Sequence, residues 1–292
     1  MAVSNNTFAR IQLRAENRIL ARLQKPYKRI REEYAKKQEV PNVVNEIQQA
    51  IFFGILTAFI LGRTEIVAEE YKRGKKQFLD VADAEAIQYV LKSDKDLFYS
   101  LVGKRLFREI MNEADAMSAY FSPSQGAMEF LKDYSFDLAL RKQGDISKVA
   151  QRLFDVTLEE GMSNKEAATF LQKGIGDLTR TSANAIARTE STRAFNFGTL
   201  SEAQSSDMVI GYRYNAILDN ATTDICRERN GKYIPKDDIR ALATNTPPLH
   251  VNCRSRLETV FKGERTGELI PADAPETKNR PSDIKAVVDF LT

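Results

Sequence analysis

The chain has 292 residues, of which 42% are hydrophobic and 28% charged, a composition that excludes disordered and fibrous classes and is typical of globular proteins. Its length allows one large or two modest domains, and its net charge of +3 is too small to indicate nucleic-acid binding by the molecule as a whole. Its two cysteines are too few for a disulfide framework.

The N-terminal segment concentrates the positive charge. Residues 1–38 carry ten basic and three acidic side chains, a net charge of +7, which leaves −4 for the rest. A helix over residues 5–38 would align four arginines into one ridge, which is either a solvated face or a binding surface: Arg10, Arg14, Arg18 and Arg22. Pro26 is expected to kink or divide this helix. The polar first residues are unlike a secretory signal, so we expect the protein in the cytoplasm where it is made.

A second helix is predicted from residue 42, with Gly62 as its stop. Its apolar run at residues 50–61 (AIFFGILTAFIL) is shorter than the ~20 residues that cross a bilayer. This favours a buried helix over a membrane-active segment, and no stable membrane insertion is expected.

Further helices are predicted in the middle of the chain. Residues 121–124 (FSPS) indicate a turn, and an amphipathic helix follows at residues 146–160, ended by Gly161. Ser163 and Glu166 then form a capping box, the start of another helix. After breaks at Gly174 and Gly176, a long helix is predicted over residues 178–204.

The pattern changes to short strands after residue 207. Residues 208–218 alternate as a strand with Ile210, Tyr212 and Tyr214 on one side. Asn230-Gly231 indicates a tight turn into a second strand at 232–234. Residues 256–261 alternate as a third strand. Residues 263–281 have the composition of a linker, and residues 282–291 of a short helix that docks either on its own domain or on a partner.

The predicted fold is therefore mainly α with a small C-terminal α+β module, that is, a helical body followed by a short antiparallel sheet. Three regions are expected: an N-terminal helical region with a basic arm (1–140), a central domain with helices at 145–205 and the sheet module at 208–262 (141–262), and a linker with a C-terminal tail (263–292).

Cys226, His250 and Cys253 are both cysteines and the single histidine of the chain, gathered within 28 residues. Thiolate and imidazole are preferred zinc ligands, and His250 and Cys253 are close enough in sequence to bind one ion from a single turn. The residues predict a zinc site that clips the small module together. The alternative is a buried pair of free cysteines beside a hydrogen-bonded histidine.

A structural zinc site needs a fourth ligand. Asp219 is the leading candidate, at the end of the first predicted strand, and Asp224 or a water molecule are the alternatives. A catalytic zinc is disfavoured, because a single histidine excludes the His-Glu-x-x-His signature and no glutamate follows His250 at the deaminase spacing. A structural zinc ion suits a three-stranded module that is too small to be stable alone.

Several motifs together resemble the phage Mu F-like head-morphogenesis family. They are Asp219-x2-Thr222 with Cys226, residues 230–232 (NGK), residues 247–254 (PPLHVNCR), residues 186–194 (IARTESTRA) with Asn196 and Gly198, and residues 161–163 (GMS) with Glu166. The resemblance covers residues 145–261 and implies that Asp219, Cys226, His250 and Cys253 form the metal cluster. Ser255 departs from the pattern, since many relatives have a cysteine there.

The resemblance implies a minor capsid protein, not an enzyme, of a tailed bacteriophage. Such a protein acts in procapsid assembly at the portal protein, with scaffolding or major capsid protein and genomic double-stranded DNA as further partners, and it can influence DNA packaging or ejection. It would reside in the virion, in the capsid interior or at the portal vertex, and in the host cytoplasm during assembly. The alternatives are a virion-packaged zinc-dependent hydrolase and an injected DNA-binding protein that uses the arginine ridge.

Arg188, Glu190 and Arg193 form a charged group on one predicted helix. A catalytic role is possible by residue type. The favoured interpretation is an ordinary helical ion pair between Glu190 and Arg193, with Arg188 bracing the zinc module against the helix.

Overall fold

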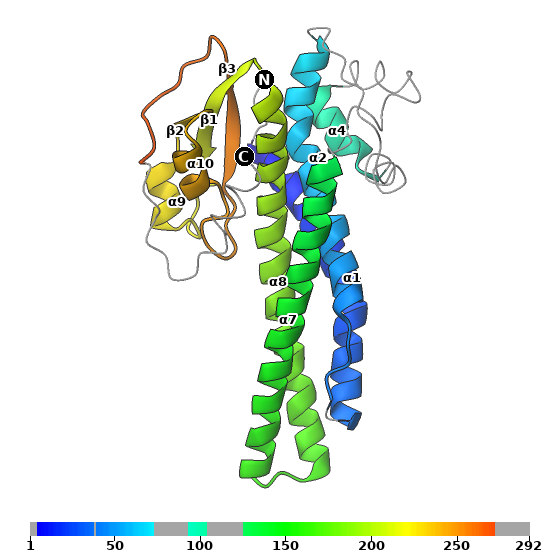
Figure 1. Cartoon of the computed structure of the whole chain (residues 1–292). Coiled ribbons are helices and arrows are strands. Elements are labelled where there is room, and N and C mark those ends of the chain that lie inside the picture. The colour runs from blue at the N-terminus through cyan, green and yellow to red at the C-terminus, as the bar shows by residue number, and fades with distance from the viewer. Residues whose placement is uncertain (1–4, 38, 73–92, 104–124, 272–292) are drawn as a thin grey trace. The chain divides into compact units, whose positions relative to one another are not determined.

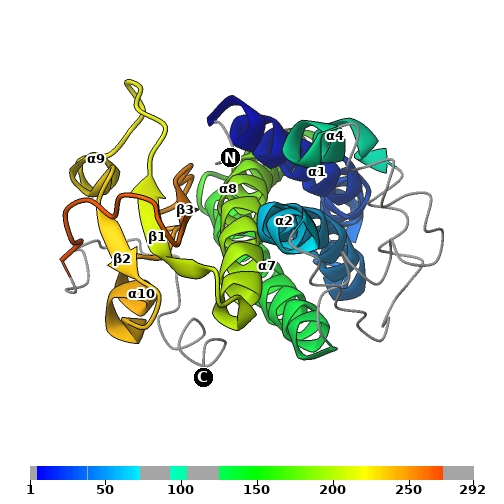
Figure 2. The ribbon, with the colours of Figure 1, turned by 90° about the horizontal axis from the view of Figure 1, so that it is seen from above.

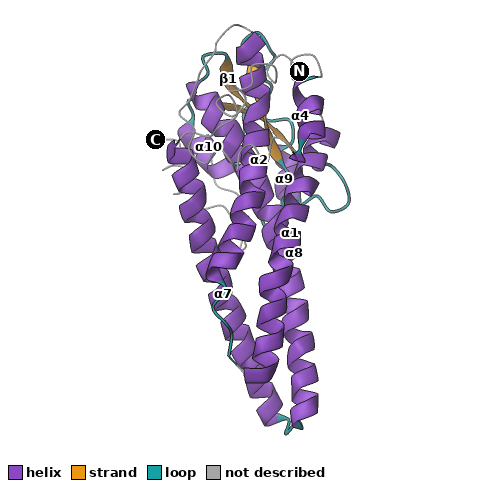
Figure 3. Cartoon of the chain, turned by 90° about the vertical axis from the view of Figure 1, so that its right-hand side faces the viewer, coloured by secondary structure: helices purple, strands orange, loops and turns teal. Residues whose placement is uncertain are grey.

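The computed structural model describes residues 5–37, 39–72, 93–103 and 125–271, which are mostly helical (Figure 1; Figure 3). The helices are α1 (Asn5–Lys37), α2 (Val44–Lys72), α4 (Lys95–Val102), α7 (Gln125–Glu159), α8 (Asn164–Ser205), α9 (Asp224–Arg229) and α10 (Ile239–Asn245), and the strands are β1 (Val209–Asn215), β2 (Tyr233–Pro235) and β3 (Arg256–Phe261). The predicted class, mainly α with a small C-terminal α+β module, is confirmed.

The chain forms two compact units, each assembled from segments distant in sequence. The first unit takes its described residues from 1–15, 55–128 and 188–292, and the second unit consists of residues 16–54 and 129–187. Helices α1, α2, α7 and α8 each contribute residues to both units. These units cut across the three consecutive regions expected from the sequence.

In the second unit, α1 buries an apolar face at helical spacing, with Ile19, Leu23, Tyr27, Ile30 and Tyr34 at most 3% exposed. The Tyr34 hydroxyl donates to the carbonyl oxygen of Ala150 in α7 at 2.6 Å. Helix α1 continues through Pro26, so the expected division does not occur there. The buried residues on either side of Pro26 hold the helix together by packing, which outweighs the loss of one backbone hydrogen bond.

Helix α7 starts at Gln125, well before the expected residue 146, and residues 121–124 lie outside the described part. Gly161, with φ of +60°, follows its end as predicted. The capping box is confirmed, because the Ser163 backbone N–H donates to Glu166 Oε2 at 3.0 Å and the Glu166 N–H donates to Ser163 Oγ at 3.4 Å.

Helix α8 runs without interruption through Gly174 and Gly176, where breaks were predicted. At Gly174 a Cβ atom would lie 2.8 Å from Leu153 Cδ1 of α7, so this glycine allows the two helices of the second unit to approach closely. A glycine inside a helix costs only ~1 kcal/mol relative to alanine, and close packing offsets that cost.

Helix α2 also passes its predicted stop at Gly62 and ends at Lys72. A Cβ at Gly62 would collide with the backbone carbonyl of Phe195, and a Cβ at Gly198 would collide with that of Phe59. The Thr199 hydroxyl donates to the Gly62 carbonyl oxygen at 3.0 Å. Gly62 therefore marks a close contact between α2 and α8 in the first unit.

The apolar part of α2 is a core helix. Val44–Thr64 is long and apolar enough to cross a membrane by length and composition, but 72% of that stretch is buried within the protein. This agrees with the predicted buried helix. One charged residue in this part of α2, Arg63, is also buried, and it pairs with Glu202 of α8.

The α+β module has a three-stranded antiparallel sheet in the order β2-β1-β3, with α9 and α10 beside it (Figure 2). The central strand β1 buries Tyr212 and Tyr214 completely, whereas Ile210 on the same side is half-buried. Gly231, with φ of +83°, makes the turn before β2. All three predicted strands are confirmed.

The start of the expected linker is part of the module. The Tyr233 N–H donates to the Glu268 carbonyl oxygen at 2.6 Å, and the Ile270 N–H donates to the Tyr233 carbonyl oxygen at 2.8 Å. Ile270 is 6% exposed. Residues 268–270 are therefore packed against the module through the buried Ile270, which the linker-like composition did not predict. The remainder of the linker and the predicted helix at 282–291 lie outside the described residues.

Candidate metal centre

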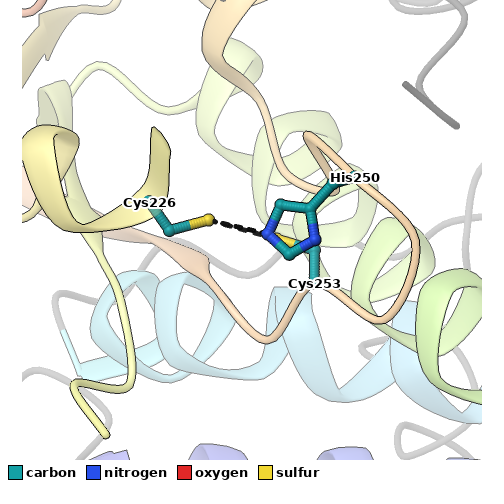
Figure 4. Close-up of side chains that lie close together, drawn as sticks. All are labelled: Cys226, His250 and Cys253. Atoms are coloured by element: carbon teal, nitrogen blue, oxygen red, sulfur yellow. Dashed lines mark hydrogen bonds between the residues drawn. The ribbon is translucent and has the colours of Figure 1, made fainter. Parts of the chain in front are cut away.

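Cys226, His250 and Cys253 converge in the α+β module (Figure 4). Cys226 lies in the first turn of α9, and His250 and Cys253 lie in the loop between α10 and β3. Their potential ligand atoms all lie within 4.8 Å of one another. Both cysteines are buried and His250 is half-buried. The three residues thus form one cluster, as the sequence predicted.

A tight turn places His250 and Cys253 on the same side of the loop. The Cys253 N–H donates to the His250 carbonyl oxygen at 3.2 Å, which closes a four-residue turn. Asn252, at the third position, has φ of +62°, a left-handed conformation that asparagine tolerates better than most residues. The turn residues, and not only the ligands, therefore determine the cluster geometry.

Two distances within the cluster can be compared with those around a tetrahedral zinc ion. With Zn–S bonds of about 2.3 Å, two sulfur ligands of a tetrahedron lie about 3.8 Å apart, and Cys226 Sγ and Cys253 Sγ are separated by 3.8 Å. Cys226 Sγ and His250 Nε2 are 3.1 Å apart, somewhat closer than the roughly 3.6 Å of an ideal S–Zn–N pair. A soft donor set of two sulfurs and one imidazole nitrogen selects zinc over magnesium or calcium.

Neighbouring groups orient the histidine for metal binding. His250 Nδ1 lies 2.9 Å from the Val251 carbonyl oxygen, and because a carbonyl only accepts, Nδ1 carries the proton. In the neutral imidazole the lone pair of Nε2 therefore faces Cys226 and is available to a metal, whereas the protonated ring donates a hydrogen bond to Cys226 from Nε2. The Thr223 hydroxyl lies 3.0 Å from Nε2 and can donate a hydrogen bond to it.

The cysteine pair is electrostatically asymmetric. The pKa of Cys226 is lowered, first by the hydrogen bond from the Cys253 thiol and further by those from His250 and the Tyr214 hydroxyl. The pKa of Cys253 is raised, mainly by burial. The pKa of His250 is raised by its hydrogen bond with Cys226. Cys226 is therefore the residue that is readily available as a thiolate for metal binding.

Asp219, the leading candidate for the fourth ligand, is not part of the cluster. Its two carboxylate oxygens accept hydrogen bonds from both terminal nitrogens of Arg254, at 2.6 and 2.7 Å. This bidentate pair lowers the pKa of Asp219 to about 2. The alternative candidate, Asp224, has a 94% exposed side chain 3.9 Å from Arg227. Neither carboxylate belongs to the group of converging donors in the described residues.

The fourth coordination position is compatible with a water molecule. A small pocket of about 10 Å³ lies beside the cluster, lined by Thr223, Cys226, His250, Asn252 and their neighbours. That volume holds about one water molecule. Water was the third possibility that the sequence left open.

Helix α8 holds the cluster loop through polar side chains that sequence reasoning missed. The Thr192 hydroxyl donates to the Cys253 carbonyl oxygen at 2.7 Å and accepts from Gln12 Nε2 at 2.6 Å. Thr189 Oγ1 accepts from the Asn252 N–H at 3.0 Å, and Asn196 Oδ1 accepts from the Leu257 N–H at 2.6 Å. Thr189, Thr192 and Asn196 all lie in or beside the 186–194 motif, whose charged residues give the stronger sequence signal.

Two charged residues of that motif form a buried ion pair. Arg193 Nε donates to Glu190 Oε2 at 3.0 Å, which confirms the expected ion pair, but both side chains are less than 10% exposed. The pair is thus part of the core of the first unit and not an exposed surface pair. Arg188 is half-buried, and its carbonyl oxygen accepts from the Ser191 hydroxyl at 3.1 Å.

The four arginines of the ridge are divided between the two units. In the first unit, Arg10 and Arg14 each contact Asp96 at 3.2 Å, and Arg14 also contacts the buried Asp94 at 3.3 Å. In the second unit, the Arg22 guanidinium lies 4.9 Å from the centroid of the Phe53 ring, and Arg18 is half-buried. Local partners thus take up part of the positive charge expected to face DNA or a protein.

The fold is a mainly helical protein whose α+β module carries a Cys/His/Cys cluster that could hold a metal ion. Residues 147–258 match the family model described as Phage Mu protein F like protein. No curated protein and no solved structure matches the chain significantly. The match supports the phage Mu F-like family for residues 147–258, as their motifs predicted.

Proposed function

We propose that the protein is a minor capsid, head-morphogenesis protein of a tailed bacteriophage that acts in procapsid assembly at the portal. The family match at residues 147–258, which contains all three cluster residues, carries this proposal. Within the same proposal, the protein resides in the capsid interior or at the portal vertex and influences DNA packaging or ejection. Portal protein is its main partner, with scaffolding or major capsid protein as further contacts.

The metal centre in this proposal is structural and not catalytic. Cys226 and Cys253 are buried, and the adjoining pocket of about 10 Å³ is far smaller than the ~300 Å³ or more of small-molecule sites. Asp219 is held by Arg254 and is not positioned as a general base. A zinc ion here would join α9 to the loop before β3, which adds a cross-link to a module with little core of its own.

Copurification from infected cells tests the assembly role. Tagged protein should recover portal protein from assembling heads, and antibodies should detect it in purified procapsids. Deletion of the gene should give misassembled or empty heads. Normal heads without the protein, together with failure to recover portal protein, would contradict the proposal.

A further inference from the structure

A second candidate site lies in the second unit, in a pocket between α1 and α8 that the metal centre does not involve. Its volume is about 310 Å³, and all of its lining residues come from this unit. We call it the α1–α8 pocket. It is lined by Leu20, Leu23, Gln24, Tyr27, Arg31, Thr179, Arg180, Ala183 and Asn184.

The pocket has an apolar floor and a polar, cationic rim. Leu23, Tyr27 and Ala183 are at most 7% exposed and form the floor. Gln24, Arg180 and Asn184 are exposed at the rim. This arrangement suits an occupant that buries an apolar group and keeps polar groups near solvent.

The residues that line the pocket carry positive charge and no negative charge. Two guanidinium groups line it, and no acidic residue does. Arg31 is half-buried and makes no ion pair or hydrogen bond with any described residue, whereas Arg180 has only a long, exposed contact of 4.0 Å with Asp177. A partly exposed guanidinium whose donors are not taken up by a protein acceptor can bind an oxyanion.

Two features of the packing position these groups. The Arg31 stem passes over Gly176, where a Cβ atom would lie 3.5 Å from Arg31 Cδ. Burial raises the pKa of Tyr27 to about 12, and its buried hydroxyl has no hydrogen-bond partner among the described residues. The wall thus contains an unused polar group in addition to Arg31.

We propose that the α1–α8 pocket is a docking site for an acidic segment of another protein, which inserts an apolar side chain against Leu23 and Tyr27 and sets a carboxylate against Arg31. A phosphate of duplex DNA is a poorer match, because the DNA backbone has no apolar group to fill the floor and is bound at exposed basic surfaces. A guanidinium binds a carboxylate through paired hydrogen bonds, which gives direction to the docked segment. The inference adds a contact site to the proposed assembly role but does not depend on it.

A random library of 12-residue peptides, selected on the full-length protein, tests the proposal. We expect enrichment of peptides in which Asp or Glu adjoins Leu, Ile or Phe. Binding of the best synthetic peptide, measured by calorimetry, should weaken about tenfold in Arg31→Gln and further in the Arg31→Gln/Arg180→Gln double variant. It should be unchanged in Arg152→Gln, which replaces an exposed arginine of the same unit on α7.

Ala183→Leu, which adds volume to the floor, should abolish peptide binding while circular dichroism shows the fold intact. If that variant does not fold, the arginine variants decide the question. Failure to enrich acidic, apolar peptides overturns the proposal, as does binding that survives the double arginine substitution. The proposal would also be overturned, in favour of nucleic acid, if no peptide binds and the protein binds a 20-base-pair DNA duplex that the double variant does not bind.

Discussion

Gly62 of α2 lies directly against the backbone carbonyl of Phe195 in α8, and the same relationship recurs in reverse between Gly198 and Phe59. Each glycine is three residues after the phenylalanine of its own helix. The paired contacts bring the two backbones of the first unit so close that only hydrogen fits at positions 62 and 198.

Replacing either glycine by alanine should therefore destabilise the protein. The added Cβ meets backbone atoms, which cannot turn aside as a side chain does, so Gly62→Ala or Gly198→Ala should lower the free energy of unfolding by roughly 1–3 kcal/mol. Denaturant unfolding measures this. The control is Gly144→Ala in α7, where nothing lies within 4 Å and a gain of roughly 0.5–1 kcal/mol is expected. Equal effects at positions 62 and 144 would contradict the close contact.

Metal analysis of substituted proteins should separate the three cluster residues from Asp219. The purified protein should contain one zinc ion per chain, and a chelator should lower its melting temperature. Cys226→Ser and His250→Ala should lose the metal. Asp219→Asn should keep it, because the carboxylate binds Arg254, and Asp224→Asn is the matched control. Loss of zinc in Asp219→Asn alone would identify Asp219 as the fourth ligand after all.

The Asp219–Arg254 pair also predicts a pH dependence. The folded pKa of Asp219 is about 2, below its ordinary 3.8, so its stabilising contribution is complete above about pH 4 and is lost as the pH falls towards 2. The difference in melting temperature between the natural protein and Asp219→Asn should be small, since the pair is exposed, and should shrink over that interval. A difference that stays constant down to pH 2 would show that Arg254 does not hold the carboxylate.

Thr192 should support the metal centre although it binds no metal. Thr192→Val removes both the acceptor for Gln12 and the donor to the Cys253 carbonyl oxygen. We expect a loss of roughly 1–3 kcal/mol in unfolding free energy and a roughly 10- to 100-fold weaker zinc affinity in a competition titration. Thr169→Val, whose exposed hydroxyl bonds only to Lys165 of its own helix, should change neither quantity. If the two variants behave alike, α8 does not hold the cluster loop.

The turn between His250 and Cys253 should depend on the residue at position 252. Asn252→Gly should be tolerated, because glycine adopts positive φ readily. Asn252→Val should cost roughly 1–2 kcal/mol, since a β-branched residue is disfavoured in this conformation. Thermal melting compares the two, with the exposed neighbour Val251→Ala as control. Equal melting temperatures for the glycine and valine variants would show that the turn relaxes.

The sequence predicted those features that local patterns determine. Tyr212 and Tyr214 alternate as a strand, Ser163 and Glu166 cap a helix, and the cysteines with His250 are rare residue types close together in the chain. The prediction from sequence was wrong at several glycines, which can either end a helix or allow two helices to pack closely. Gly62 and Gly174 look like helix stops, but each sits inside a helix at a close contact with another helix, and the partner position is distant in sequence.

Long-range pairing explains the remaining misses. Gln12 and Thr192 are 180 residues apart, and no periodicity or motif connects them. Asp219 lies near Cys226 along the chain, whereas in space its carboxylate accepts hydrogen bonds from Arg254, next to Cys253. Glu190 and Arg193 have the spacing of a surface pair, and only the packing around α8 shows that they are buried.

The division of α1 and α8 between two units sets a limit on dissecting the protein. A polypeptide cut to residues 147–258 would contain the whole cluster but would omit α1 and α2. Buried side chains of α8 such as Phe195 and Phe197 would then meet water, and Thr192 would lose its amide neighbour. Recombinant work on the metal centre should start from the intact gene product, since homology marks a stretch of sequence here and not a self-sufficient folding unit.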